Sequence, residues 1–165
     1  MKKILSAVLA TMLLLSLTMT AFAATGIGSC TSVAVTAATA EQAGSVAVDT
    51  YMCAVTLDEE GKIVAVAFDV VQSKGTFDAA GAVVGEASIV SQTKNELKDS
   101  YGMKAISPIG KEYYEQMDAL AAWCVGKTVE EVLTLSADDA DLKAGCTVYI
   151  GTHLMALEKA AANAK

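Results

Sequence analysis

Apolar residues alternate with small or polar residues through much of the first half of the chain, a period of two that is typical of β-strands. Residues 46–57 and 63–71 are two such runs. The polar stretch 58–62 lies between them and places Gly61 where a turn needs a positive φ. This pattern predicts a β-hairpin. Both faces of the second run are largely apolar, so we expect it to be a central strand covered on both sides. Residues 77–84, with Gly81 at a tight turn, predict a short hairpin at an edge.

From residue 91 the period becomes helical. Thr93 and Thr128 are each followed three residues later by Glu, which predicts a capping box at the start of two short helices. Ser107 followed by Pro predicts the N-terminus of a longer helix that ends at Gly126, and its apolar stripe is formed by Ile109, Tyr113, Met117, Leu120 and Cys124. A last helix is expected from Gly151 or Thr152. The chain is therefore expected to be an α+β protein, with a small, mainly antiparallel β-sheet and helices packed on it.

The first 23 residues have the layout of a secretory signal peptide. Lys2 and Lys3 precede an apolar run over 4–17, and Ala21-Phe22-Ala23 provides a cleavage site. The run is shorter than the ~20 apolar residues of a membrane span. We therefore expect a signal peptide over 1–23 and a single secreted domain over 24–165. A cell-surface lipoprotein is the alternative, because residues 27–30 form a loose lipobox that would tether the chain to the membrane at Cys30.

The charge pattern excludes one class of partner. All 12 basic residues are lysines. Without the leader ten lysines remain against 19 acidic residues, which gives a formal charge of −9. A nucleic-acid-binding protein needs cationic side chains against phosphate, so we expect no nucleic-acid partner. The chain also lacks the planar guanidinium that holds carboxylates and phosphates with two hydrogen bonds. We expect the partner to be a small ligand or a cell-surface protein.

Four cysteines lie beyond the leader, and an even number in an exported chain permits two disulfides. The pairing Cys30–Cys53 with Cys124–Cys146 is favoured because each bond closes a loop of just over 20 residues. The alternative is four small buried hydrophobic residues that never pair. Their spacing differs from metal-binding knuckles, so no metal site is expected.

Candidate chemistry in the sequence is sparse. A helix beginning at Ser107 could hold an anion beside Lys104 and Lys111, although an ordinary helix cap explains the same residues. His153 is the lone histidine, and we expect it to have a surface or capping role. The acidic residues Asp138, Asp139 and Asp141 suggest a solvated loop rather than a calcium site. No residue is assigned a catalytic role.

Two segments resemble the small exported FMN-binding domains of bacterial respiratory and electron-transfer proteins. Residues 55–66 (VTLDEEGKIVAV) are similar to that family's hairpin. Residues 144–160 (AGCTVYIGTHLMALEKA) look like a diverged version of its S-G-A-T loop and the C-terminal helix that follows. The resemblance implies FMN as a cofactor, with Gly145 and Thr147 at its phosphate. Tyr149 and Met103 would line the cleft for its ring, and Lys104 completes the set of cofactor-binding candidates. The middle of the chain, residues 93–116, is similar to uncharacterised exported proteins of Gram-positive bacteria.

Three hypotheses follow. The first is a secreted, non-catalytic α+β domain that binds a ligand or partner at the cell surface. The alternative is an extracellular FMN-binding, electron-transfer module. An enzyme such as a hydrolase ranks third, because the sequence contains no recognisable pair of nucleophile and base.

Overall fold

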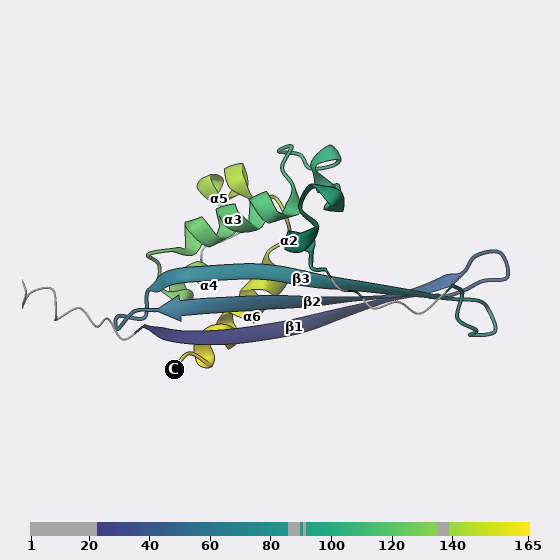
Figure 1. The fold of residues 1–165 in the computed structure, drawn as a ribbon, viewed down its shortest axis with the longest axis horizontal. Helices are drawn as coiled ribbons and strands as arrows, with labels where there is room; N and C mark the ends of the chain where they lie inside the picture. The colour runs from purple at the N-terminus through teal and green to yellow at the C-terminus, as the bar shows by residue number, and fades with distance from the viewer. Residues whose placement is uncertain (1–22, 86–89, 91, 135–138) are drawn as a thin grey trace, which may run out of the picture.

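Three long antiparallel strands form the framework of the protein (Figure 1). The computed structural model describes residues 23–85, 90, 92–134 and 139–165. Strands β1 (Ala24–Thr36), β2 (Gly44–Leu57) and β3 (Ile63–Phe77) pair in the order β1-β2-β3. The hairpin expected from residues 46–71 is confirmed as β2 and β3. The short hairpin expected over 77–84 is present as a bridge between Phe77 and Val83, with Gly81 at φ 83°.

The prediction that residues 63–71 form a central strand is wrong. β3 is an edge strand, β2 lies at the centre, and one face of β3 is open because Ala65 and Ala67 are exposed. Alanine and valine are small enough to be tolerated on a face that touches water, so an apolar composition on both faces did not mean burial on both.

Helices follow the sheet in the chain, and the expected α+β fold is confirmed. They are α2 (Lys94–Leu97), α3 (Tyr113–Cys124), α4 (Val129–Thr134), α5 (Ala140–Gly145) and α6 (Gly151–Ala162). Two 3₁₀ helices, η1 (Lys98–Tyr101) and η2 (Met103–Ala105), connect α2 to α3. Among the described residues, none of the helices is long and apolar enough to cross a membrane. The leader expected over 1–23 lies almost entirely outside the described residues, as does Asp138 of the acidic loop.

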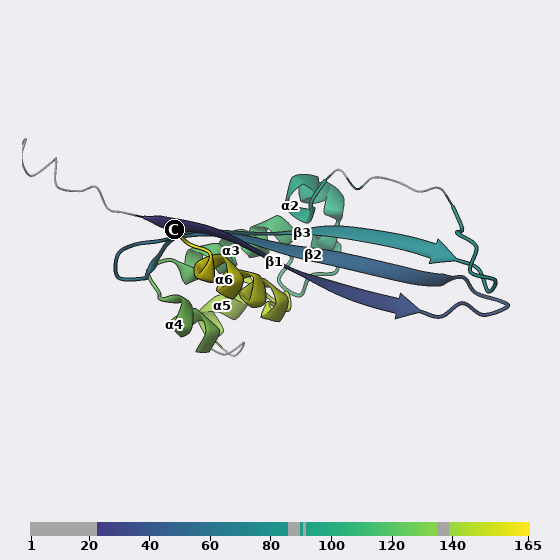
Figure 2. The same ribbon diagram turned by 90° about the horizontal axis from the view of Figure 1, so that it is seen from below.

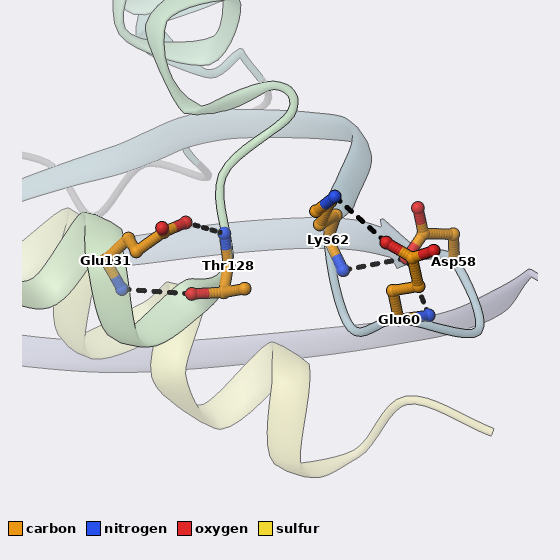
Figure 3. Close-up of polar contacts among 5 residues, drawn as sticks. All are labelled: Asp58, Glu60, Lys62, Thr128 and Glu131. Carbon is orange, nitrogen blue, oxygen red and sulfur yellow. Dashed lines mark hydrogen bonds and ion pairs between the residues drawn. The ribbon is translucent and has the colours of Figure 1, made fainter.

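A polar turn and a capping box lie next to each other at the start of β3 (Figure 3). Asp58 Oδ1 accepts hydrogen bonds from the backbone N–H groups of Glu60 and Lys62 and so holds the β2–β3 turn. Thr128 and Glu131 cap α4 reciprocally, as the sequence predicted. The segment leading to Thr128 pairs with β3, because the N–H of Ile63 donates to Lys127 O at 2.9 Å. The loop between α3 and α4 thus covers this end of the β3 edge.

Two glycines let α6 lie directly against β1. Gly26 and Gly28 are on the helix-facing side of the strand, where a Cβ on Gly28 would lie 2.3 Å from both Ala156 O and Ala160 N. Side chains at the end of α6 then cover the outer edge of β1: Asn163 Nδ2 donates to Ile27 O at 3.0 Å and Lys159 Nζ donates to Ser29 O at 3.0 Å. These contacts fix α6 over the first half of β1.

The hydrophobic core lies between one face of the sheet and the helices. The sheet contributes Cys53, Val55, Phe68 and Val70, α3 contributes Tyr113, Met117, Leu120 and Cys124, and α6 contributes Ala156, Leu157 and Ala160. The predicted apolar stripe of α3 is therefore confirmed from Tyr113 onward. The predicted helix start at Ser107 is wrong, because residues 107–110 form a turn and α3 begins at Tyr113.

The strands extend well beyond the helices. Figure 2 shows the ends of β1 and β3 and the beginning of β2 projecting to one side of the helical layer. We call this projection, residues 31–36, 44–50 and 71–77, the arm. Val33 and Val35 lie there, with side chains 62% and 66% exposed. Among the described residues no helix packs on the arm, and at its tip Thr76 and Phe77 pair with Val84 and Val83.

Candidate functional site

The buried amide of Gln116 organises the region where the sequence placed its cofactor-binding residues. Its Oε1 accepts hydrogen bonds from Thr147 N at 2.9 Å, Thr147 Oγ1 at 3.2 Å and Val148 N at 3.2 Å. Its Nε2 donates to Ser107 Oγ and to Lys111 O, both at 3.1 Å. The side chain is 1% exposed. Gln116 therefore joins the loop before α3 to the segment between α5 and α6, and each of its hydrogen-bonding atoms has a partner.

Glu112 holds a second part of the same loop. Its carboxylate accepts from Met103 N at 2.8 Å and from Lys104 N at 3.0 Å, and the residue is 3% exposed. Glu112 and Glu115 also form a reciprocal capping box at the N-terminus of α3. The anion site predicted at Ser107 is therefore replaced by a different arrangement: the helix begins five residues later, and carboxylates of the chain itself lie at its N-terminus.

The structure brings three of the five predicted cofactor-binding residues near Gln116. Thr147 bonds to it directly, Met103 Sδ lies 3.6 Å from its Nε2, and Lys104 follows Met103 in η2. Tyr149 is 80% exposed, and Gly145 lies against α3, where an added Cβ would be 2.8 Å from Ala119 Cβ. The hydroxyl and N–H that Thr147 would offer to a flavin phosphate are both bonded to Gln116. A phosphate could take these donors only if the Gln116 side chain moved away.

His153 forms a buried pair with Tyr113, which the sequence did not indicate. The Tyr113 hydroxyl lies 2.8 Å from His153 Nε2, and the rings of Tyr51 and Phe68 meet the imidazole edge-on at 4.9 and 6.1 Å. The predicted surface or capping role is wrong, because His153 is 1% exposed. Burial lowers the pKa of His153 to about 4, so the imidazole is neutral at physiological pH.

The four cysteines are free thiols in the structure, and neither predicted pair is bonded. Cys53, Cys124 and Cys146 are buried, whereas Cys30 is half-buried with its Sγ donating to Thr152 O at 3.1 Å. Burial raises the pKa of Cys53 and of Cys124 to about 12. A thiol needs to ionise to act as a nucleophile or metal ligand, so these side chains are held in their unreactive form. In the described part of the chain, no group of three His, Cys, Asp or Glu side chains is placed to hold a metal.

The face of the sheet opposite the helices exposes several large apolar side chains. Pairing places Val33 opposite Val48 and Val35 opposite Val46, and alternation places Ile27 on the same side. Ile27 is 70% exposed. We call this the outer face, with members Thr25, Ile27, Ser29, Thr31, Val33 and Val35 of β1, Val46, Val48, Thr50, Met52, Ala54 and Thr56 of β2, and Ala65, Ala67, Asp69, Val71, Ser73 and Gly75 of β3. Asp69 is the charged residue among them.

Two open hollows lie away from the Gln116 network. One, of about 320 Å³, is between β1 and α6 and is lined by Ile27, Gly28, Ser29, Lys159, Ala162 and Asn163. The other, of about 410 Å³, lies at the tip of the arm between residues 39–43 and 78–80. The residues lining the first hollow include Lys159 and Asn163, whose hydrogen bonds hold α6 against β1. The second hollow is lined by two turns.

Comparison with known proteins gives one partial similarity. A protein named chlorophenol reductase, from Desulfitobacterium hafniense, is 37% identical over 91 residues, which are 48% of this chain and 28% of that protein. The chain thus spans little more than a quarter of the length of this relative. No protein-family model and no solved structure matches the chain.

Proposed function

We propose that the chain is a secreted, non-catalytic binding domain that uses the outer face of its sheet to hold a protein partner at the cell surface. The observation that carries this proposal is the exposure of Ile27, Val33 and Val35 on a face that no described helix covers. Exposed apolar side chains gathered on one face of a sheet commonly mark an interaction site.

The edges of the sheet are covered beside the helices, which supports the outer face as the binding surface. In its first half, outside the arm, the β1 edge is covered by α6 side chains and by Lys165, whose N–H and C=O pair with Thr25. The β3 edge is covered at Ile63 by the loop before α4, and at Phe68, whose carbonyl accepts from Asn95 Nδ2 at 2.7 Å. Covered edges prevent strand addition there. Binding to this part of the sheet is therefore directed to the open face.

Site-specific photo-crosslinking on intact cells tests this function. A photoreactive amino acid at Val33 is expected to form a protein adduct, whereas one at Ala34 should not, because Ala34 is exposed on the opposite side of the same strand. Equal adduct yields at the two positions, or none at Val33 and Val35, would contradict the proposal.

The second candidate function is an FMN-binding redox module, and the named reductase relative favours it. Met103 and Thr147 both contact Gln116, and Lys104 follows Met103, so three of the residues that the resemblance implies lie together; Thr147 would reach a phosphate once Gln116 moved away. Titration with FMN followed by visible absorbance tests it, and intact mass detects any covalently bound flavin. We expect Thr147→Val to abolish binding if the module is real, with Thr31→Val as the control on the outer face. A wild-type chain that stays colourless in excess FMN removes this candidate.

A further inference from the structure

We infer that the partner of the outer face is a second copy of this chain, which packs its own outer face against the first to form a two-fold symmetric dimer. This inference rests on the proposed function, because it names the partner of the same surface. Two sheets would lie face to face about 10 Å apart, with their side chains interdigitated, as in a β-sandwich. A two-fold axis brings identical surfaces together, so Val33 and Val48 of each copy would be buried by the corresponding face of the other.

The size of the outer face suits such a dimer. β1 has 13 residues and β3 has 15. At about 3.4 Å per residue and about 4.8 Å between strands, the three strands present a surface on the order of 600 Å². Two such surfaces together reach the lower bound of a specific, stable interface, about 1,200 Å² in total. A second copy is a partner whose surface has the same length, width and twist.

The chemistry of the face favours an uncharged partner. Its members are mostly Val, Ala, Thr and Ser, and adjacent threonines already share hydrogen bonds across the strands: Thr25 with Thr56 at 3.0 Å and Thr31 with Thr50 at 3.2 Å. Asp69 is occupied at the β3 edge, where its Oδ1 accepts from Val70 N at 2.7 Å and Asn95 N at 3.1 Å. Covering this surface with a copy of itself would remove apolar groups from water, and the hydroxyls of these four threonines would keep their partners.

The net charge of the chain predicts opposite salt dependences for binding a second copy and for binding a basic protein. Without its expected leader the chain carries a formal charge of −9, so two exported copies repel at long range. The acidic turn residues Glu41, Asp58 and Asp78 lie at the ends of the strands, away from the centre of the outer face. Salt screens repulsion between exposed charges, so the dimer should become tighter as ionic strength rises. Binding to a basic protein would become weaker under the same change.

Sedimentation equilibrium on the full exported chain, as purified after export, tests the inference with two matched double variants. Val33→Lys/Val35→Lys places two ammonium groups on the outer face, and Ser32→Lys/Ala34→Lys places the same charges on the opposite side of the same strand, at positions that are also exposed. We expect a wild-type dimer whose dissociation constant rises about tenfold or more in the first variant and stays within about twofold of wild type in the second. A third variant, Val33→Thr/Val35→Thr, keeps the β propensity of the strand, so it tests the dimer even if the lysine variant fails to fold. We expect it to weaken the dimer as well.

The outcomes separate the two proposals. A dimer disrupted only by outer-face variants, and tightened by added salt, supports the inference. A chain that is monomeric at all accessible concentrations, or a dimer that both lysine variants weaken equally, overturns it. If the chain is monomeric and Val33 still crosslinks on cells to a different protein, the inference fails while the proposed function stands. If no adduct forms and the chain is monomeric, both fail.

Discussion

The hydroxyl of Tyr113 lies 2.8 Å from Nε2 of His153, and both side chains are at least 98% buried. Tyr113 begins α3 and His153 lies in the first turn of α6, so this hydrogen bond joins the two longest helices above the sheet. Nδ1 of His153 is buried with no hydrogen-bond partner among the described residues. Burial raises the pKa of Tyr113 and lowers that of His153, so both groups are neutral over the physiological range.

The buried imidazole makes stability depend on pH. Because the folded pKa of His153 is about 4 and the ordinary value is 6.5, the unfolded chain binds the proton first as the pH falls. The contribution of neutral His153 is fully present above pH 6.5 and is lost progressively down to about pH 4, a total of about 3 kcal/mol. Urea unfolding at several pH values checks this. His153→Gln should lose this part of the pH dependence, and an identical pH profile in the variant would contradict the prediction.

Tyr113→Phe should destabilise the protein by about 1–3 kcal/mol, because it leaves Nε2 of His153 buried without a partner. The double variant Tyr113→Phe/His153→Phe removes both polar groups. We expect it to be less destabilised than the sum of the two single variants, by about 1 kcal/mol in a double-mutant cycle. Tyr114→Phe is the matched control, because Tyr114 is the next residue and its hydroxyl makes a long, exposed contact with Asp99 at 3.4 Å. Additive single effects would show that the two groups are not coupled.

Much of the fold follows from local patterns. The alternation over 46–71 and the reciprocal Thr–Glu spacings at 93 and 128 predict structures made by residues close in sequence, and these are confirmed. The start of α3 was misplaced because Ser107 and Pro108 satisfy the local rule for a helix start. The tertiary bonds of Glu112 to Met103 N and Lys104 N instead hold the loop in another conformation.

The buried polar groups could not be found in the same way. Gln116 bonds to Thr147 across 31 positions and His153 to Tyr113 across 40, and nothing in the local sequence shows these contacts. One signal was available for Gln116: it precedes Met117 on the buried stripe of α3, so a polar residue there needed an explanation. The side on which the sheet is open was also hidden, since small or apolar residues occur on both faces of β3: Val64 and Val66 on one, Ala65 and Ala67 on the other.

Gln116→Leu should destabilise the protein by about 2–4 kcal/mol, because the backbone N–H groups of Thr147 and Val148 lose their acceptor inside the protein. Hydrogen exchange should become faster at these two amides. Gln72→Leu is the control, because Gln72 is exposed on the arm and makes one hydrogen bond, at 3.3 Å, to Asp49. Equal effects of the two substitutions would show that the Gln116 network does not hold the α5–α6 segment.

The cysteines should react in two classes. Cys30 is half-buried, whereas burial raises the pKa of Cys53 and Cys124 to about 12. Under native conditions a maleimide should label Cys30 first, and Cys53, Cys124 and Cys146 only after unfolding. Intact mass before and after reduction tests the disulfides expected from the sequence. A mass increase on reduction would contradict the four free thiols of the structure.

A single methyl group added at Gly28 should be strongly destabilising. A Cβ there would lie 2.3 Å from Ala156 O and Ala160 N, both backbone atoms of α6, so the helix itself would have to shift. Gly28→Ala should therefore cost about 3 kcal/mol or more, close to the upper range for overpacking. The control is Gly75→Ala in β3, where an added Cβ meets nothing within 4 Å and φ is not positive. We expect that variant to be neutral or more stable by about 0.5 kcal/mol, since alanine restricts the unfolded chain. Thermal unfolding of both proteins checks the pair, and soluble yield reports a Gly28→Ala chain that fails to fold. Equal stability of the two variants would mean that α6 does not lie against β1 as closely as the structure has it, and the hydrogen bonds from Lys159 and Asn163 to the β1 edge would then be in question as well.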